Sequence, residues 1–377
     1  MIKREKTLII MLILALCVPL FSCRNKDNGE INSEVDVDIE IESDLTSAAE
    51  EFADSLLSTM TLEQRVGQCL MPSIYASTDP STLALLKKYI DDYHVGGIVL
   101  LKGNLSSAKE LAEIGSESPI PLFIAIDAEW GLGMRLKDAP VYPKNGNIGK
   151  DVSDTELFDY GFKIAGECRE VGINMVLGPV VDITSVNRGV IGKRSFGDNP
   201  ERVSDFGVAY AKGLESGSVI SVAKHFPGHG STIIDSHKGV AKVKRNISAM
   251  DSIDLKPFKD YVNLGLTGIM AGHIQSLALD PDGKVATVSM DMLTSLLREE
   301  MGFKGLVLTD AFDMGGAKGF SVSEALQAGA DLILSPLNIN REFKKLLEAV
   351  KNGQLDIKIV NDRCKRILFY KYIFGIL

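Results

Sequence analysis

Short apolar segments alternate with longer amphipathic segments along the chain from about residue 47 onward. The apolar segments have the length of β-strands and are apolar at nearly every position, without a regular alternation of polar residues. Such uninterrupted runs are typical of strands that are buried on both faces of a parallel sheet. The pattern predicts eight strands, at residues 68–74, 96–101, 121–127, 174–183, 219–225, 268–274, 305–311 and 331–336.

The amphipathic segments between these runs predict helices, because their apolar residues recur at helical spacing. The first helix is predicted at 48–60, and Thr61 with Gln64 three residues later matches a capping box that begins the next one. The other helices are predicted at 82–93, 107–114, 156–171, 200–217, 255–264, 290–301, 322–329, 342–352 and 357–374.

Alternation of buried strands with helices predicts parallel βα units, and we expect one α/β domain folded as a (β/α)8 TIM-like barrel. A doubly wound open sheet is the alternative, but no glycine-rich phosphate fingerprint follows the first predicted strand. The carboxyl ends of the predicted strands favour the barrel, because such barrels place their active sites there. A reactive side chain lies at that end of five different strands: Asp127, Asp182, His225, His273 and Asp310.

The first 22 residues have the pattern of an export signal, with three basic residues before an apolar run at 8–21. Residues 20–23 (LFSC) resemble the lipobox of bacterial lipoproteins. On that resemblance we expect cleavage before Cys23, lipidation of this residue, and attachment to the bacterial outer membrane on its periplasmic or outer face. An ordinary signal peptide or a short membrane anchor is the alternative. The polar, acidic residues 23–46 predict a flexible tether, and residues 47–377 the folded domain.

Charge and cysteine content exclude two classes of protein. The formal net charge is −9 and the acidic residues are spread along the chain, which disfavours a nucleic-acid partner. Beyond the signal and the lipobox, three cysteines remain, Cys69, Cys168 and Cys364. Their number is odd and they fall within predicted strands or helices, so we expect buried thiols and no disulfide framework.

Ionisable residues concentrate in one segment, 224–237 (KHFPGHGSTIIDSH), at the end of a predicted strand. Asp235 and His237 are candidates for a catalytic pair, because a carboxylate can orient and polarise an imidazole for proton transfer. A polar turn without a chemical role is one alternative. A zinc site of His225, His229, Asp235 and His237 is another, but His225 and His229 flank a Pro-Gly turn and share no helical face.

Asp310 ends the predicted strand at 305–311, and small residues follow it. Glycoside hydrolysis with retention needs a carboxylate nucleophile on one side of the anomeric carbon and a proton donor on the other. Asp310 suits the first role, and His237 assisted by Asp235 suits the second in place of the usual carboxylic acid. A buried structural carboxylate is the alternative for Asp310.

The segments at 224–237 and 307–316 together resemble glycoside hydrolase family 3, and more closely its β-N-acetylglucosaminidase branch, in which an Asp-Ser-His loop supplies the acid/base. Residues 190–197 (VIGKRSFG) and 174–182 resemble further segments of the family, so the resemblance runs from about residue 63 to residue 373. It implies a retaining enzyme that removes terminal β-linked N-acetylhexosamine from oligosaccharides or peptidoglycan fragments. In that enzyme Asp310 is the nucleophile, and His237 with Asp235 is the acid/base.

The resemblance also implies a set of substrate-binding residues. Lys224, His225 and Arg194 are similar to family residues that hydrogen-bond sugar hydroxyls. Asp127 matches the residue that contacts the outer hydroxyls of the ring, and Arg135 stands where the family has a second arginine that points into the pocket.

Three positions depart from the family pattern. Trp130 and Leu132 stand where the family has a glycine and an arginine, and Ser231 stands where it usually has an aspartate. Trp130 is the only tryptophan, and both stacking on a sugar face and packing beneath the loop remain open for it. These changes affect the choice of substrate more than the central reaction.

We expect a monomer that needs neither a metal nor an organic cofactor. A phosphorylase is one alternative activity, because a histidine acid/base repels phosphate less than a carboxylate does. An inactive glycan-binding lipoprotein is another. A β-glucosidase of the same family is a third, although those enzymes typically take a carboxylate acid/base from a second domain.

Overall fold

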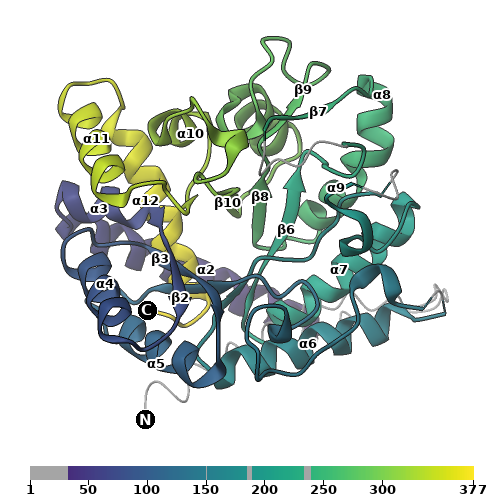
Figure 1. Cartoon of the computed structure of the whole chain (residues 1–377), viewed down its shortest axis with the longest axis horizontal. Helices are drawn as coiled ribbons and strands as arrows, with labels where there is room; N and C mark the ends of the chain where they lie inside the picture. The colour runs from purple at the N-terminus through teal and green to yellow at the C-terminus, as the bar shows by residue number, and fades with distance from the viewer. Residues whose placement is uncertain (1–32, 150, 185–188, 233–238) are drawn as a thin grey trace.

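A curled parallel sheet is the centre of the computed structural model, which describes residues 33–377 except 150, 185–188 and 233–238. The sheet has seven strands in the order β10-β8-β6-β5-β4-β3-β2, all neighbours being parallel. Helices surround it in Figure 1, as expected for successive βα units. The strands are β2 (Ser73–Ala76), β3 (Gly97–Gly103), β4 (Phe123–Ile126), β5 (Met175–Val176), β6 (Ile220–Phe226), β8 (Gly268–Ala271) and β10 (Leu306–Thr309).

A separate parallel pair, β1 (Leu70–Met71) with β11 (Ile333–Leu334), lies beside this sheet. An isolated bridge between Leu308 and Leu332 and a few backbone hydrogen bonds connect it to β10, without a continuous ladder between β10 and β11. The structure therefore confirms a TIM-like (β/α) fold with a curled seven-stranded sheet, whereas the predicted closed eight-stranded barrel is not shown. The physical reason is the shortness of β1 and β11, which leaves too few ladder positions for a continuous sheet.

Prolines and a turn change the predicted strand boundaries. The segment predicted at 68–74 is divided between β1 and β2 at Pro72, and the one at 174–183 is reduced to β5 before Pro179. Proline lacks the N–H that a ladder position requires, so both strands are interrupted there. The segment predicted at 268–274 ends with β8. The next strand, β9 (Ile274–Ser276), instead pairs with β7 (Ala241–Val243) outside the main sheet.

The predicted helices are present, and side-chain caps fix the starts of most of them, α9 and η6 being exceptions. Thr61 and Gln64 form the predicted capping box of α3 (Leu62–Gln68), and Ser153 with Glu156 forms that of α6 (Asp154–Glu170). Each box satisfies backbone N–H groups that have no partner within the helix. The others are α4 (Pro80–Asp91), α5 (Leu105–Ser116), α7 (Pro200–Ser216), α8 (Ile247–Ala249), α9 (Lys256–Asn263), α10 (Val322–Ala328), α11 (Ile339–Lys351), α12 (Ile357–Ile373) and the π-helix η6 (Asp291–Glu300).

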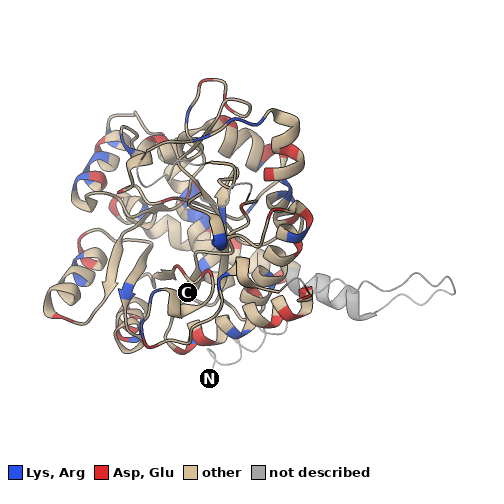
Figure 2. Cartoon of the chain, turned by 45° about the vertical axis from the view of Figure 1, so that its right-hand side comes forward, with Lys and Arg blue, Asp and Glu red and all other residues tan. Residues whose placement is uncertain are grey.

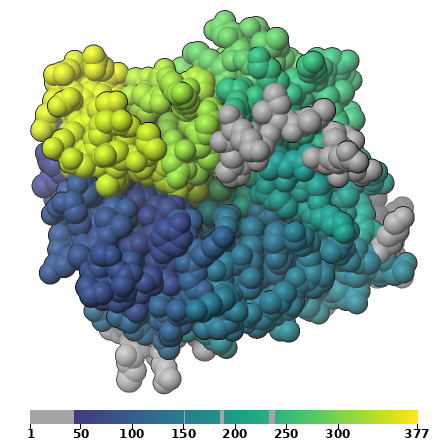
Figure 3. All heavy atoms as spheres, viewed as in Figure 1, coloured from purple at the N-terminus to yellow at the C-terminus, as the bar shows by residue number. Residues whose placement is uncertain are grey.

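The two ends of the chain lie side by side, as the purple and yellow spheres of Figure 3 show, and helices from both ends pack together. Helix α2 (Ser33–Thr59) lies against α12, where Phe52 stacks near Tyr372 and Lys365 pairs with Glu50. The helix begins well before the predicted start at 48, so it includes residues 33–46 of the segment predicted as a tether. Adding residues to an existing helix costs little compared with starting one, which explains the extension. Among the described residues, no helix is long and apolar enough to cross a membrane.

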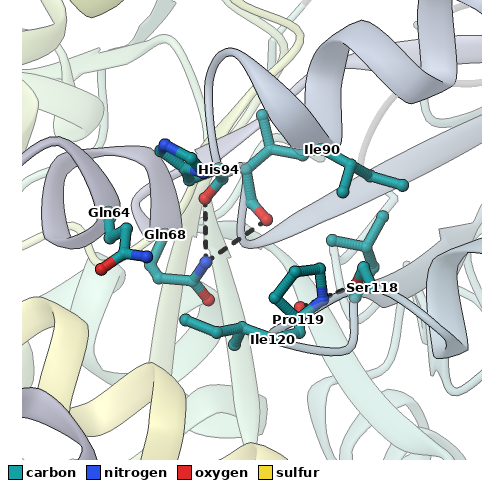
Figure 4. Close-up of a pocket in the computed structure, with 9 residues that line it drawn as sticks. Gln64, Gln68, Ile90, His94, Ser118, Pro119 and Ile120 are labelled. Carbon is teal, nitrogen blue, oxygen red and sulfur yellow. Dashed lines mark hydrogen bonds between the residues drawn. The ribbon is translucent and has the colours of Figure 1, made fainter. Parts of the chain in front are cut away.

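The amino ends of the strands hold a small cavity of about 30 Å³ (Figure 4). Gln68 spans this region, donating to the carbonyl oxygens of His94 at 2.8 Å and Val95 at 3.4 Å. Its Oε1 accepts a hydrogen bond of 2.8 Å from Nζ of Lys371, a fully buried residue of α12. Burial lowers the pKa of Lys371 to about 7. This end of the fold therefore carries a polar network that serves packing, and the reactive residues lie at the opposite end.

Candidate active site

A cavity of about 450 Å³ opens at the carboxyl ends of the strands, where the sequence placed the reactive side chains. Charged residues of the outer helices are interspersed in Figure 2, whereas those of the cavity come from the strand ends. The structure brings six predicted site residues together on its wall: Asp127, Arg135, Arg194, Lys224, His225 and Asp310.

Asp127 follows β4 and is held between two cations. Its Oδ1 lies 2.7 Å from Nζ of Lys224, and its Oδ2 lies 2.5 Å from Nη2 of Arg135. Burial raises the pKa of Asp127, but the charges of Lys224 and Arg135 outweigh it and hold the pKa well below its usual range. The carboxylate is therefore an ionised, fixed hydrogen-bond acceptor on the cavity wall.

Glu129 is a site residue that the sequence reasoning missed. Its fully buried side chain accepts two hydrogen bonds from Arg194, at 2.7 and 3.0 Å, and lies 2.9 Å from Nζ of Lys224. Burial raises its pKa, but Lys224 and Arg194 lower it to about 2. A signal was available, because Glu129 is two residues beyond Asp127 and residues i and i+2 of an extended segment point to the same side.

His225 is oriented by Asp182, which follows β5. Nδ1 of His225 lies 2.7 Å from Oδ2 of Asp182, and the backbone N–H of His225 donates to the same carboxylate at 3.2 Å. The N–H of His229 donates to Oδ1 of Asp182 at 2.6 Å. Burial raises the pKa of Asp182, but His225 and His229 bring it below its ordinary value. Asp182 thus fixes the loop after β6, and Nε2 of His225 lies 3.5 Å from Arg194.

Asp310 lies at the end of β10, and its carboxylate is on the cavity wall. Its N–H donates to the carbonyl of Ala271 in β8 at 2.7 Å, and its Oδ1 accepts the N–H of Ala311 at 2.8 Å. Burial raises the pKa of Asp310, but His225, His273 and the N–H of Ala311 lower it below its ordinary value. An ionised carboxylate held by its own backbone at the end of a strand is positioned to meet a ligand in the cavity.

Of the other predicted site residues, only Trp130 belongs to the described part of the chain. Trp130 is not among the described residues that line the cavity, and Nζ of Lys144 lies 5.2 Å from the centre of its ring. Asp235 and His237 lie outside the described residues, as does Cys23. In the described part of the chain, no group of three or more His, Cys, Asp or Glu could hold a metal ion.

The arrangement can bind a polar, uncharged ligand through many directed hydrogen bonds. Cationic donors and anionic acceptors alternate around the wall, and each is fixed by a partner of opposite charge, so little reorganisation accompanies binding. Asp310 stands among them as a carboxylate that the ion pairs of the described residues do not include.

A TIM-like fold with such a site at the carboxyl ends of its strands defines a broad class of proteins, and comparison with known proteins narrows it. Residues 61–369 match the family described as "Glycosyl hydrolase family 3 N terminal domain". The chain therefore belongs to glycosyl hydrolase family 3, and the resemblance noted in the sequence is confirmed.

Relatives with curated names include two beta-hexosaminidases. Beta-hexosaminidase A of Pseudoalteromonas piscicida is 36% identical over 322 residues, which cover 75% of this chain and 54% of that protein. The beta-hexosaminidase of Nitrosomonas eutropha is 34% identical over 257 residues, covering 64% of this chain and 73% of that protein. The chain thus spans about half the length of the first of these relatives.

Solved structures agree with the fold. A family 3 beta-N-acetylglucosaminidase from Paenibacillus has a TM-score of 0.78 at 30% identity, covering 84% of this chain and 63% of that chain. A beta-glucoside phosphorylase has a TM-score of 0.82 over 87% of this chain and 61% of that chain. At 22% identity the second likeness shows the fold alone.

Proposed function

We propose that this protein is a retaining β-N-acetylglucosaminidase. It would hydrolyse terminal, non-reducing β-linked N-acetylhexosamine from oligosaccharides or peptidoglycan fragments. The names of its relatives, beta-hexosaminidase and beta-N-acetylglucosaminidase, support this substrate class. The observation that carries the proposal is the position of Asp310, an ionised carboxylate on the wall of the same cavity as five predicted sugar-binding residues.

In the proposed reaction Asp310 attacks the anomeric carbon while His237, assisted by Asp235, donates a proton to the leaving oxygen. The bond from the anomeric carbon to the leaving oxygen breaks as the bond to a carboxylate oxygen of Asp310 forms. Neutral His237 then takes a proton from water, the water oxygen attacks the anomeric carbon, and the ester to Asp310 breaks. No step of this sequence uses a metal or an organic cofactor.

The charged wall supports the binding half of the proposal. Lys224 and Arg194 would donate to sugar hydroxyls while Asp127 accepts from them, which matches the donor and acceptor character of a hydroxyl group. Their mutual ion pairs fix the geometry before the sugar arrives. Preorganised polar groups favour binding because less ordering remains to be done in the complex.

The decisive experiment measures release of p-nitrophenol from p-nitrophenyl β-N-acetylglucosaminide, with and without phosphate. We expect phosphate-independent hydrolysis by the wild type and a loss of about a thousandfold or more in Asp310→Ala. Asp282→Ala, at an exposed turn, is the matched control and should retain wild-type activity. Activity that survives in Asp310→Ala would refute the nucleophile, and a rate that requires phosphate would favour the phosphorylase.

A second experiment tests the covalent intermediate directly. A fluorinated N-acetylglucosaminyl donor with a good leaving group should form the ester quickly and release it slowly. Mass spectrometry of the digested protein should then place one glycosyl unit on the peptide that contains Asp310. A protein that binds the sugar but forms no adduct and no product would be an inactive glycan-binding protein.

We also propose that Cys23 anchors the exported protein to the outer membrane, on the evidence of the lipobox-like residues 20–23. In an expressing cell, wild type should sediment with membranes and Cys23→Ala should not. Sedimentation of Cys23→Ala with membranes would overturn the proposed anchor and would leave the proposed glycosidase activity unaffected.

We further propose that residues 47–377 form one domain with a closed barrel. Backbone hydrogen bonds support it, since the N–H of Thr309 donates to Leu332 at 3.0 Å and the N–H of Ile333 donates to Cys69 at 2.9 Å. Through these bonds the β1–β11 pair would complete the circle between β10 and β2. Hydrogen exchange tests this: slow exchange of both amides supports closure, and fast exchange opposes it.

A further inference from the structure

His273 lies two residues beyond the end of β8, the strand that pairs with β10 in the main sheet (Figure 1). It is completely buried and is not among the described residues that line the cavity, whereas Asp310 and Ala311 of the neighbouring segment are. Neither the proposed two-step reaction nor the proposed binding of the sugar uses it. A buried imidazole that lies beside the reaction centre but outside the cavity would act on the reaction through other residues.

Both nitrogens of the His273 ring have a partner. Nε2 lies 3.0 Å from the carbonyl oxygen of Ala311, and Nδ1 lies 3.0 Å from Oγ1 of Thr287. A carbonyl oxygen only accepts hydrogen bonds, so Nε2 donates in the first contact. The hydroxyl of Thr287 can donate or accept, so it satisfies Nδ1 with or without a proton. Thr287 is itself completely buried, in the short 3-10 helix η5 (Ala286–Val288), so the ring is held at both of its nitrogens.

Ala311 connects this ring to the proposed nucleophile. Its N–H donates to Oδ1 of Asp310 at 2.8 Å. Its carbonyl oxygen accepts from His273 and, at 3.2 Å, from the N–H of Met314. The N–H and the carbonyl belong to rigid peptide groups on either side of one Cα, and only two dihedral angles separate them. Anchoring the carbonyl therefore restricts the rotation that would turn the N–H away from the carboxylate.

The main sheet holds the residues on either side of Ala311 but not Ala311 itself. The N–H of Asp310 donates to Ala271 in β8, and the N–H of Phe312 donates to Leu334 in β11 at 2.9 Å. Both backbone groups of Ala311 are instead bound by Asp310, His273 and Met314. His273 thus supplies a restraint from β8 that the strand ladder does not provide at this position.

The two carboxylate oxygens of Asp310 consequently have different surroundings. Among the described residues, only Oδ1 accepts a hydrogen bond, and the donor is the N–H of Ala311. Oδ2 is therefore the oxygen left to attack an anomeric carbon. A nucleophile must meet its carbon at about 3–3.5 Å with its orbitals aligned, so a small rotation of the carboxylate would lower the rate without weakening the binding of the sugar.

We propose that His273 is a positioning residue for the nucleophile. Held by Thr287, its Nε2–H anchors the carbonyl of Ala311, and the N–H of Ala311 fixes Oδ1 of Asp310 so that Oδ2 meets the anomeric carbon. The inference rests on the proposed glycosidase function, and it adds a residue that supports the formation of the ester to Asp310.

The test compares two matched pairs of variants. Thr287→Val removes the hydroxyl and keeps the shape of the side chain, whereas Thr287→Ser keeps the hydroxyl. His273→Leu removes the donor, whereas His273→Gln keeps an N–H near the position of Nε2. For wild type and each variant, kcat and KM are measured with p-nitrophenyl and 2,4-dinitrophenyl β-N-acetylglucosaminide. The inhibition constant of N-acetylglucosamine and the free energy of unfolding in urea are measured on the same proteins.

We expect Thr287→Val and His273→Leu to lower kcat and kcat/KM by roughly 10- to 100-fold, with Thr287→Ser and His273→Gln closer to wild type. KM and the inhibition constant should stay near their wild-type values, because the lost contact acts on the attack and not on the bound sugar. The loss should be equal for both substrates, since Asp310 attacks the same carbon in each. A fault in proton donation would instead spare the 2,4-dinitrophenyl substrate, whose leaving group departs without a proton.

Wild-type kcat/KM in His273→Leu and Thr287→Val overturns the positioning role and leaves the glycosidase standing. A loss confined to the p-nitrophenyl substrate also overturns it, because the affected group is then the proton donor. A rise in KM and in the inhibition constant that accounts for the whole loss overturns it as well, since His273 then acts on sugar binding.

The Thr287 pair keeps the test decisive if His273→Leu does not fold, because both of its members retain the imidazole. Equal kcat/KM in Thr287→Val and Thr287→Ser then overturns the proposal. Absence of hydrolysis of both substrates by wild type overturns the proposed function, and the positioning role with it.

Discussion

Glu129 accepts two hydrogen bonds from the guanidinium of Arg194, although the residues are separated by 65 positions in the sequence. Such a two-point contact fixes both the position and the plane of the guanidinium. Glu129 itself is fully buried, so this pair and Lys224 account for the ionised state of the carboxylate. The arginine that is proposed to bind the sugar is thereby held in place before substrate arrives.

Replacing Glu129 with glutamine should weaken catalysis without unfolding the protein. Glutamine keeps the shape but loses the charge that balances Arg194 and Lys224, and hydrogen bonds between charged groups contribute about 1.5–3 kcal/mol. We therefore expect kcat/KM for the p-nitrophenyl substrate to fall by roughly 10- to 100-fold. Glu113→Gln, on the exposed face of α5, is the control, and equal kinetics in both variants would refute the role of Glu129.

Replacing Lys224 with glutamine should shift the pH dependence of activity. The charge of Lys224 lowers the pKa of Asp127, Glu129 and, less strongly, Asp310. Removing a cation raises the pKa of a nearby carboxylate, so protonation begins at a higher pH. The acid limb of the kcat/KM profile should therefore move to higher pH.

The profile is measured for wild type, Lys224→Gln and the exposed control Lys242→Gln. An unchanged acid limb in Lys224→Gln, at whatever absolute rate, would show that Lys224 does not govern the ionisation of the essential carboxylate.

Asp182→Asn should lower stability as well as activity. The carboxylate accepts N–H groups from both His225 and His229, and an amide cannot accept at both of its ends. A buried donor without a partner costs about 1–3 kcal/mol, which we expect as the loss in the free energy of unfolding in urea. Asp159→Asn on the exposed face of α6 should unfold like wild type. Wild-type stability in Asp182→Asn would contradict the network.

The buried amine of Lys371 should make the free energy of unfolding depend on pH. Its pKa is lowered to about 7 in the folded protein, against 10.5 for the unperturbed group, because it is buried. Between these two values the unfolded chain binds the additional proton, so the free energy of unfolding should rise with pH by roughly 1.4 kcal/mol per unit. Below about pH 7 both states are protonated and this contribution no longer changes.

Lys371→Met removes the titration, so the wild-type minus variant difference in unfolding free energy should increase from pH 7 to pH 9. Taking the difference cancels the contribution of titrating groups that do not interact with Lys371. The exposed Lys358→Met should keep the wild-type slope. Parallel pH curves for wild type and Lys371→Met would show that the amine is not a titrating buried group.

The sequence pattern by itself determined the order of strands and helices and the placement of Asp127, His225 and Asp310 at one end of the fold, and the resemblance to the family added Arg135, Arg194 and Lys224. It could do so because apolar periodicity and helix capping are local properties of the chain, as the box formed by Thr61 and Gln64 illustrates. Parallel strands then bring their carboxyl ends to one side, whatever the loops contain.

Only the tertiary structure decided which charges meet. The pairing of Glu129 with Arg194 and the hydrogen bond from Lys371 to Gln68 depend on segments far apart in the sequence. The hydrophobic pattern also gave wrong strand boundaries at Pro72 and Pro179, where a proline interrupts the sheet. The length of a strand depends on hydrogen bonds to its neighbours, and the local pattern carries no information about them. Contacts across the fold, and the pKa values that follow from them, are set by packing and not by local sequence.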